Sequence, residues 1–271
     1  MNLKELFGRK PRVGLSLAGG GAKGVAYIPF LRALEELNVN IAAISGSSIG
    51  AGIGGLYAAG LSPSELVGVL DSFRPGHLRE VFRINWHGRG IISAKSVHEF
   101  LMDTLPVTRF DQTRIPLKVV ATDYWRREQV VFDSGSLADA MQASTAVPGV
   151  FEPVVLDGRV LIDGSIKNTL PYELLREDCD FVIALDVSNR VRNPDRTDVP
   201  RNLAMVLNTF RILTDSNTEY KLRYEPVDLY FRLKLPNIEM FDFYKYQEIF
   251  DAAEPEVKRF SAELSKKLRL R

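Results

Sequence analysis

A serine in a glycine-rich turn is the first residue of this chain whose surroundings suggest chemistry. The segment Gly46-Ser47-Ser48-Ile49-Gly50 follows a short apolar run and opens a stretch with helical spacing. In a Gly-x-Ser-x-Gly turn the serine takes a strained backbone conformation that larger neighbours would obstruct, and the amides of the next helix point at its hydroxyl. We therefore predict that Ser48 is a nucleophile, with Gly46 and Gly50 as its elbow glycines. A turn that serves only packing is the alternative.

An activated serine needs a base, and Asp163 is the best candidate for it. The sequence Asp163-Gly164-Ser165 ends a predicted hairpin strand, a position from which the carboxylate could accept the Ser48 proton. Hydrolases of this turn type usually place a histidine after the acid, but all three histidines precede Asp163: His77, His87 and His98. They lie in or beside an irregular, arginine-rich stretch. Because triads occur in several chain orders, a histidine-dependent hydrolase stays an alternative, as does a plain Asp-Gly turn.

A third motif, Gly19-Gly20-Gly21-Ala22-Lys23-Gly24, lies between the first apolar run and the first helical stretch. A dinucleotide site would need an acidic residue at the end of the second strand, where serines and a glycine stand instead. A P-loop would need Ser or Thr after Lys23. We therefore expect no nucleotide cofactor. An oxyanion hole remains, built from backbone N–H groups that we assign to the following residues: Gly19, Gly20, Gly21 and Ile49.

In this order and combination, the three motifs resemble those of the bacterial patatin-like phospholipases. Two further stretches match, residues 115–123 (IPLKVVATD) and 143–153 (ASTAVPGVFEP), and the resemblance covers roughly residues 12–187. It implies a three-layer α/β/α fold with a mostly parallel central sheet, a Ser48–Asp163 dyad, and motif glycines at Gly24 and Gly164. It also implies hydrolysis of acyl esters in phospholipids, lysophospholipids or related lipids, with no metal or other cofactor.

The chain departs from the family pattern at Ser165, where Gly or Ala is usual. The serine hydroxyl could hydrogen-bond to Asp163 and lower its basicity. A catalytically weak regulatory or lipid-binding member of the same fold is therefore the alternative function.

A Ser–Asp pair also makes a physical demand on the site. The unperturbed pKa of Asp is about 3.9 and that of His about 6.5, so Asp is the poorer base by roughly 3.5 kcal/mol. Desolvation of Asp163, its hydrogen bond to Ser48 and stabilisation of the oxyanion must make up this difference. We expect an acyl-Ser48 intermediate that water resolves.

The elements that must position these motifs alternate along the chain. Buried strands are predicted at 13–18, 41–45, 117–122, 129–132, 154–156, 160–162, 182–187 and 227–233, and helices at 23–37, 49–59 and 93–105. Ser62, Pro63 and Glu65 predict the N-cap, first position and capping box of a further helix. Asp157-Gly158 predicts a tight hairpin. Strands that alternate with helices indicate a parallel sheet with helices on its faces.

Composition limits the classes of protein that fit. The chain has 271 residues and 45% apolar content, which suits a single domain over residues 1–271, with a core at about 12–189 and an extension at 190–271 packed on it. A net charge of +1 gives no reason to expect nucleic acid as a partner. The single Cys179 excludes an internal disulfide and a cysteine-based zinc site. The N-terminal residues do not read as a signal peptide, so we predict a cytoplasmic protein. The sequence does not specify an oligomeric state.

A lipid substrate would need an apolar entrance and contact with a membrane surface. One candidate group is Phe73, Phe82 and Trp86 among Arg74, Arg79, Arg83 and Arg89; the other is Phe241, Phe243, Tyr244, Tyr246 and Phe250. Core packing is the alternative for both groups and is favoured for the second. Residues 257–271 place Val257, Phe260, Leu264 and Leu268 on one helical face, which could lie on anionic lipid or, as is more usual, dock on the body. The nearly uncharged residues 41–60 have the length of a membrane span, but a strand, a turn and a helix explain them better.

Overall fold

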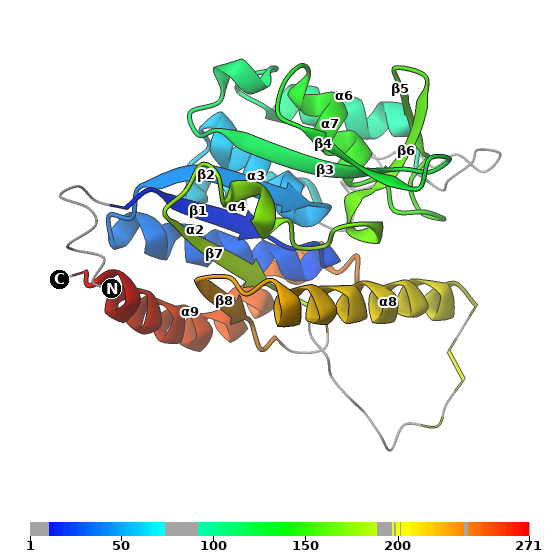
Figure 1. The fold of residues 1–271 in the computed structure, drawn as a ribbon. Helices are drawn as coiled ribbons and strands as arrows, with labels where there is room; N and C mark the ends of the chain where they lie inside the picture. The colour runs from blue at the N-terminus through cyan, green and yellow to red at the C-terminus, as the bar shows by residue number, and fades with distance from the viewer. Residues whose placement is uncertain are drawn as a thin grey trace.

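A computed structural model describes residues 11–73, 92–188, 197, 199–200, 202–235 and 238–270. Within these residues eight strands form one sheet (Figure 1), in the order β5-β6-β3-β2-β1-β7-β8 with β4 paired to β3. The strands are β1 (Val13–Leu17), β2 (Ile41–Ser47), β3 (Leu117–Asp123), β4 (Glu128–Phe132), β5 (Val154–Leu156), β6 (Arg159–Asp163), β7 (Phe181–Asp186) and β8 (Leu229–Arg232).

The centre of the sheet is parallel. Strand β1 pairs in parallel with β2 and β7, and the parallel pairing continues to β3 on one side and to β8 on the other. The antiparallel pairs involve β3, β4, β5 and β6 at one edge. All residues of β1 are buried, as expected for a central strand covered on both faces. The predicted α/β class with a mostly parallel central sheet is confirmed.

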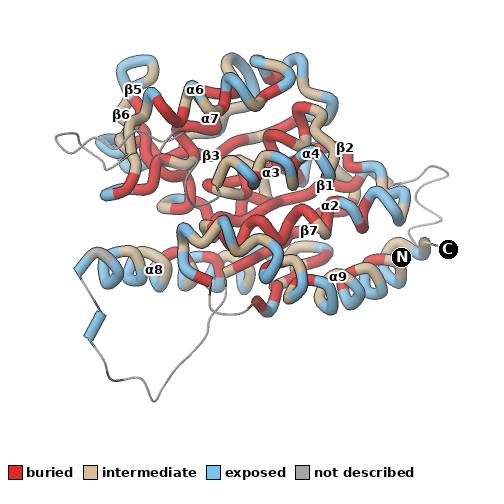
Figure 2. The backbone as a smooth tube through the Cα atoms, turned by 180° about the vertical axis from the view of Figure 1, so that it is seen from behind, coloured by how far each residue is buried: buried red, intermediate tan, exposed pale blue. Residues whose placement is uncertain are grey.

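Helices cover both faces of this sheet (Figures 1 and 2). The longer ones are α2 (Tyr27–Glu36), α3 (Ile49–Ala59), α4 (Pro63–Leu70), α6 (Ala94–Thr104), α7 (Leu137–Ser144), α8 (Asn202–Tyr224) and α9 (Tyr246–Leu268). Short 3₁₀ segments are η1 (Gly21–Ala26), η2 (Asp71–Phe73), η3 (Phe110–Gln112), η4 (Gly164–Ile166), η5 (Tyr172–Leu175) and η6 (Phe243–Lys245). Most helices contribute to one large core, whereas η5 and α8 pack on the opposite face of the sheet.

The N-terminus of α4 and the turn between β5 and β6 have the structures that their sequences predict. Ser62 caps α4: its hydroxyl accepts the Glu65 N–H at 3.3 Å, and its own N–H donates to Glu65 Oε2 at 2.7 Å. Between β5 and β6, Asp157 and Gly158 have φ values of 49° and 72°, the positive pair that a type I′ hairpin turn requires. Both predictions are confirmed.

One predicted helix differs from the structure, and two helices of the structure were not predicted. The helix predicted over residues 23–37 divides into η1 and α2, because the chain enters the helix through a tighter 3₁₀ turn, as helix N-termini often do. Helix α6 is present with Ser93 at the N-cap, although the Ser93 side chain makes no capping bond. The sequence did not suggest α7 or α8.

The C-terminal helix α9 docks on the body of the protein. The ring of Phe260 is fully buried, 5.1 Å from that of Phe30 and 5.3 Å from that of Phe231. Leu264 is also buried in the same core, which draws side chains from Val13 through to Leu264. The docked alternative for this segment is therefore confirmed, and its apolar face is used for packing.

Residues 41–60 form β2, a turn and α3 rather than one continuous helix. In the part of the chain that the structure describes, no helix combines the length and the apolar character that crossing a membrane would need.

Candidate active site

The two residues predicted to carry the chemistry lie in direct contact. Ser48 joins β2 to α3, and Asp163 is the last residue of β6. Both strands pair with β3, which brings together residues that are 115 positions apart in the chain. The Ser48 hydroxyl donates to Asp163 Oδ2 at 2.6 Å. Both side chains are buried.

The backbone of Ser48 has the strained conformation expected of a nucleophile elbow. Its φ of 52° and ψ of −127° lie in a region that residues with a side chain rarely adopt. Such a residue costs of order 1–3 kcal/mol and persists only where its surroundings hold it. Here the Ser48 N–H donates to Ser144 Oγ at 2.9 Å, and the Ser48 carbonyl accepts the N–H of Gly52 at 3.0 Å.

The environment of Asp163 makes it a better base than an aspartate in water. Burial raises its pKa to about 6, although hydrogen bonds from Ser48 and Ser165 act in the opposite direction. Its backbone is fixed on both sides: the N–H donates to the Ala146 carbonyl at 3.0 Å, and its carbonyl accepts the Thr122 hydroxyl at 2.9 Å. The carboxylate is therefore both desolvated and oriented towards Ser48.

Ser165 occupies the position where the family pattern has a smaller residue. Its backbone N–H donates to Asp163 Oδ1 at 2.8 Å, and its hydroxyl lies 3.3 Å from Ser47 Oγ. The hydrogen bonds from Ser165 lower the pKa of Asp163, as expected, but burial outweighs them. The turn accommodates the extra hydroxyl because Gly19 leaves room: a Cβ there would lie 2.1 Å from Ser165 Oγ.

The glycine loop after β1 lies beside the serine turn, because β1 and β2 are parallel neighbours and their carboxyl ends meet at one edge. The Gly19 N–H is already engaged by the fold, since it donates to the Thr169 carbonyl at 3.0 Å. Gly20, Gly21 and Ile49 stand at the start of η1 and α3, where N–H groups have no partner within the helix. Gly20, Gly21 and Ile49 therefore stay candidate oxyanion donors, while Gly19 leaves space for Ser165.

The remaining motif glycines lie where any side chain would overlap a neighbour: Gly24, Gly46, Gly50 and Gly164. A Cβ on Gly50 would lie 2.2 Å from the Leu17 carbonyl oxygen, and one on Gly164 would lie 2.0 Å from that of Val120. These contacts bring α3 and the Asp163 turn against the sheet, so the glycines set the distance between the two polar side chains.

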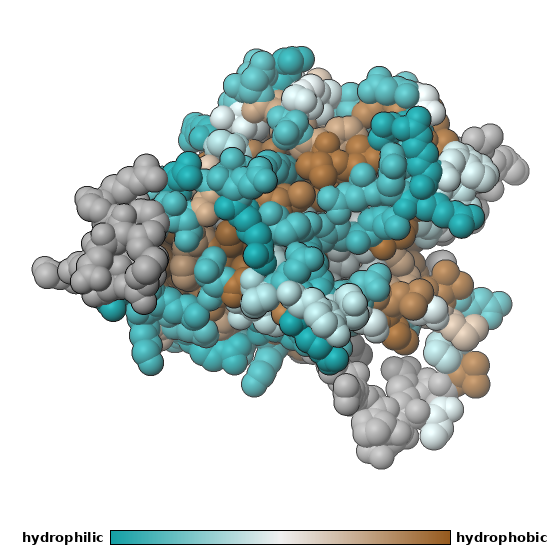
Figure 3. Space-filling model, viewed as in Figure 1, coloured by the Kyte–Doolittle hydropathy of each residue, from teal (hydrophilic) through white to brown (hydrophobic). Residues whose placement is uncertain are grey.

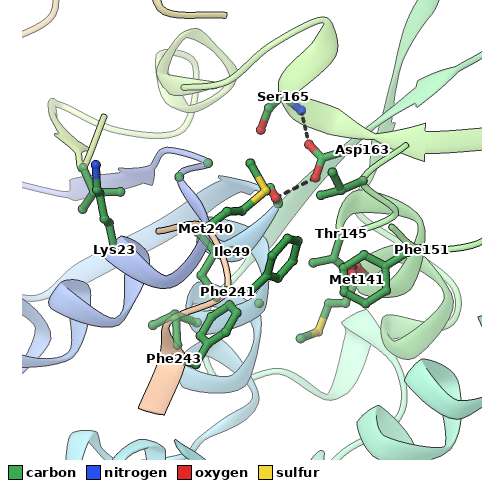
Figure 4. Close-up of a pocket in the computed structure, with 18 of the residues that line it drawn as sticks. Lys23, Ile49, Met141, Thr145, Phe151, Asp163, Ser165, Met240, Phe241 and Phe243 are labelled. Atoms are coloured by element: carbon green, nitrogen blue, oxygen red, sulfur yellow. Dashed lines mark hydrogen bonds between the residues drawn. The ribbon is translucent and has the colours of Figure 1, made fainter. Parts of the chain in front are cut away.

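An apolar cavity of about 200 Å³ adjoins Ser48 and Asp163. Aliphatic side chains from α3, α4 and α6 form much of its wall, among them Ile53, Leu56, Leu66, Leu70, Val97 and Leu101. Figure 4 shows Phe151 and Met141 grouped near Asp163, with Phe241 between them and Phe243. The shape and lining suit a hydrocarbon chain that ends at the serine hydroxyl.

The predicted aromatic entrance is partly present. Phe73 from the first group and Phe241 and Phe243 from the second line the cavity, and Phe243 also packs against the core, as was favoured for the second group. Tyr244 of the second group is 46% exposed. Tyr246 and Phe250 pack against the core instead. The other members of the first group lie outside the described residues: Arg74, Arg79, Phe82, Arg83, Trp86 and Arg89.

Several cavity residues were not anticipated from the sequence. Helix α8 supplies Phe210, Arg211, Thr214 and Asp215 to the wall, and its periodicity had given no sign of this role. Ser144, which anchors the Ser48 amide, lies within the matching stretch 143–153, and that match was the available signal.

Lys23 also lines the cavity and is only 3% exposed. Burial, and then the nearby Arg211, lower its pKa to about 8. In Figure 4 it lies on the other side of the cavity from Asp163.

Of the three histidines, His98 alone lies in the described part of the chain. His98 is partly exposed on α6, with Nδ1 3.2 Å from Asp139 Oδ1, and it does not line the cavity. His77 and His87 lie outside the described residues. Within the described ranges, His, Cys, Asp and Glu side chains form no group of three or more that could hold a metal ion.

Comparisons with known proteins show the family to which the chain is related. The model of the family "patatin-like phospholipase" matches residues 15–176. An uncharacterised NTE family protein of Mycobacterium tuberculosis (strain ATCC 25618 / H37Rv) is 35% identical over 199 residues, which is 73% of this chain and 55% of that protein. The lysophospholipase NTE1 of Kluyveromyces lactis is 27% identical, over 88% of this chain and 18% of that enzyme. The chain thus spans little more than half of one relative and under a fifth of the other, at 55% and 18%.

Among solved structures, VipD from Legionella pneumophila is similar, with 15% identity and a TM-score of 0.45 over 93% of this chain and 67% of that one.

Proposed function

Because this chain belongs to the patatin-like phospholipase family, we propose that it is a lipid acyl hydrolase in which Ser48 is the nucleophile and Asp163 the base. The observation that carries the proposal is the 2.6 Å hydrogen bond from the Ser48 hydroxyl to Asp163, beside an apolar cavity. The substrates are carboxylic esters of phospholipids, lysophospholipids or related lipids. The yeast relative described as a lysophospholipase supports this class.

In the first half-reaction Ser48 Oγ attacks the acyl carbonyl carbon while its proton passes to Asp163. Negative charge develops on the carbonyl oxygen, and the amides of Gly20, Gly21 and Ile49 stabilise it, each by roughly 3 kcal/mol. Asp163 then gives the proton to the departing alcohol oxygen as the ester bond breaks. The product of this step is acyl-Ser48.

In the second half-reaction water replaces the alcohol. The water oxygen attacks the acyl carbon while Asp163 accepts a proton from the water. The bond between Ser48 Oγ and the acyl carbon then breaks. The proton returns to Ser48, and the fatty acid leaves. A carboxylate with a pKa of about 6 can hold the proton in each intermediate state and release it again.

Two further aspects are part of the proposal. Strand β8 and helix α9 of the C-terminal extension share the large core with the preceding strands and helices, which supports a single domain with the extension packed on it. The lipid substrate requires the protein to meet a membrane surface from one side, as a peripheral protein does.

The test is a comparison of the native protein with Ser48→Ala on mixed lipid vesicles, with lipid products followed by mass spectrometry. We expect fatty acid release from the native protein only, and labelling of the native protein only by a fluorophosphonate probe. Native protein that resists the probe and releases no fatty acid would instead support the regulatory, lipid-binding alternative.

A further inference from the structure

Helix α8 exposes a row of large apolar residues on the side that faces away from the protein. Six large apolar residues of this helix are between 45% and 67% exposed: Met205, Val206, Ile212, Leu213, Tyr220 and Tyr224. Their spacings of four and seven residues place them on a single helical face. In Figure 3, apolar side chains gather over the part of the molecule where Figure 1 shows the first half of α8. We call these six residues the outer face of α8.

The inward side of α8 combines polar and apolar side chains, since Phe210 lines the cavity and Leu222 packs against the small core cluster beside η5 and β7. Thr214 and Thr218 are buried there, and Lys221 reaches the loop that follows Asp163. The Lys221 ammonium donates to Asn168 Oδ1 at 2.9 Å and to the Leu170 carbonyl at 2.8 Å, and it forms an ion pair with Glu173. Hydrogen bonds together with a few apolar contacts therefore hold the helix, and the outer face contributes little to the folded core.

An exposed apolar face of this kind indicates a partner surface. Thr209, Ser216 and Arg223 lie between its members on the same side of the helix, and Glu219, seven residues after Ile212, lies at its edge. The face therefore carries one basic residue with one acidic residue beside it. Two tyrosines, Tyr220 and Tyr224, close it with their rings 4.6 Å apart. Exposed aliphatic side chains with tyrosines beside them are the composition that a lipid interface favours.

The position of α8 adds a reason to choose lipid as the occupant. Phe210, Arg211 and Thr214 of the same helix form part of the cavity wall beside the serine. A surface that docks on the outer face therefore lies one helix diameter from the cavity. We propose that the outer face of α8 binds the surface of a lipid bilayer or micelle. The choice of lipid rests on the proposed function, since a lipid substrate reaches the cavity from such a surface.

The test is flotation of the full chain with vesicles of phosphatidylcholine, with and without phosphatidylglycerol. The double variant Ile212→Gln/Leu213→Gln removes two central members of the outer face while keeping residues suited to a helix. We expect the partition coefficient onto vesicles to fall about tenfold or more, from the apolar area that no longer enters the interface. The control Trp125→Gln/Val155→Gln removes side chains that are 74% and 68% exposed elsewhere, and should float like the native protein.

Circular dichroism and hydrolysis of a monomeric short-chain ester accompany the flotation. Both double variants should keep native helicity and native ester hydrolysis, because neither touches the cavity. Unchanged flotation of Ile212→Gln/Leu213→Gln would overturn the docking proposal, as would equal losses in the control. A native dimer that this variant converts to monomer, with flotation unchanged, would also overturn it in favour of self-association. If the native protein fails to hydrolyse the ester but the variant still loses flotation, the docking surface stands and the proposed function fails.

Discussion

The turn around Ser48 and helix α8 line the same cavity, yet their contacts with the rest of the protein differ in kind. At the turn, glycines bring backbone against backbone, so that added side chains would overlap the sheet, and even the strained φ of Ser48 is held by a hydrogen bond to Ser144. At α8 the inward contacts include buried threonines and the hydrogen bonds of Lys221, and six large apolar side chains face outward. The comparison teaches that Ser48 and Asp163 are fixed by close backbone packing, whereas α8 depends more on side-chain hydrogen bonds.

The largest expected effect is at the tight turn. Gly50→Ala places a Cβ 2.2 Å from a backbone oxygen of β1, so the helix and the sheet must separate. We expect destabilisation of more than about 3 kcal/mol or failure to fold, measured by urea unfolding. The matched control is Gly68→Ala in α4, where a Cβ meets no atom within 4 Å. That variant should be stabilised by about 0.5–1 kcal/mol. Equal effects at the two glycines would show that close backbone packing does not limit substitution at Gly50.

The next effect concerns catalysis by Asp163. Since its carboxylate is the proposed base and its pKa is about 6, kcat/KM should fall about tenfold for each pH unit below 6 and level off above it. Asp163→Asn should lower kcat by about 10²–10⁴-fold at pH 8. A pH–rate profile on a monomeric ester measures both. Asp139→Asn, at a partly exposed aspartate near His98, is the control and should keep native activity.

The same carboxylate should make folding less favourable at neutral pH. Burial raises the pKa of Asp163 from 3.8 to about 6, so the native state binds its proton more tightly than the unfolded chain does. The stability from this group is present below pH 3.8 and is lost as the pH rises through 6. Asp163→Asn should therefore be more stable than the native protein by up to about 3 kcal/mol at pH 8, with the gain absent at the acid end. Thermal unfolding across this pH range checks it; a gain that does not vary with pH would show that the charge is not its cause.

A smaller effect on the free energy of unfolding is expected for α8, where side-chain hydrogen bonds attach the helix and the exposed apolar residues contribute little. Lys221→Met removes hydrogen bonds to Asn168, Leu170 and Glu173, and should cost about 1–3 kcal/mol of unfolding free energy. Ile212→Gln on the outer face should change it by no more than about 0.5 kcal/mol. Guanidinium unfolding of the two single variants gives the contrast directly. A larger loss for Ile212→Gln would mean that the outer face belongs to the core after all.

The sequence predicts the tightly packed turn around Ser48 better than it predicts helix α8. The positions of Ser48 and Asp163 were predictable, because an elbow needs small residues at fixed offsets. The pair Asp157-Gly158 indicates a hairpin turn, and Asp163 ends the second strand of that hairpin. Their meeting across 115 residues followed only from the resemblance to a family, since local patterns carry no information about strand order.

Other parts of the site depend on tertiary contacts that no local pattern encodes. Helix α8 escaped prediction because its apolar residues do not mark a buried face. Phe241 and Phe243 read as core residues, and only the fold shows that they line a cavity. The Gly19 amide was predicted as an oxyanion donor, but the loop after β6 reaches it first through the Thr169 carbonyl.

The central claim is that Ser48 becomes acylated with Asp163 as its base, and peptide mapping of the trapped adduct tests it most directly. The native protein, Asp163→Asn and Asp139→Asn are incubated with a fluorophosphonate, and the modified residue and its rate of labelling are read by mass spectrometry. We predict an adduct on Ser48 in the native protein and in Asp139→Asn at equal rates, with labelling of Asp163→Asn slowed at least about 10²-fold. An adduct on another residue, or labelling of Ser48 in Asp163→Asn at the rate of the native protein, would contradict the account.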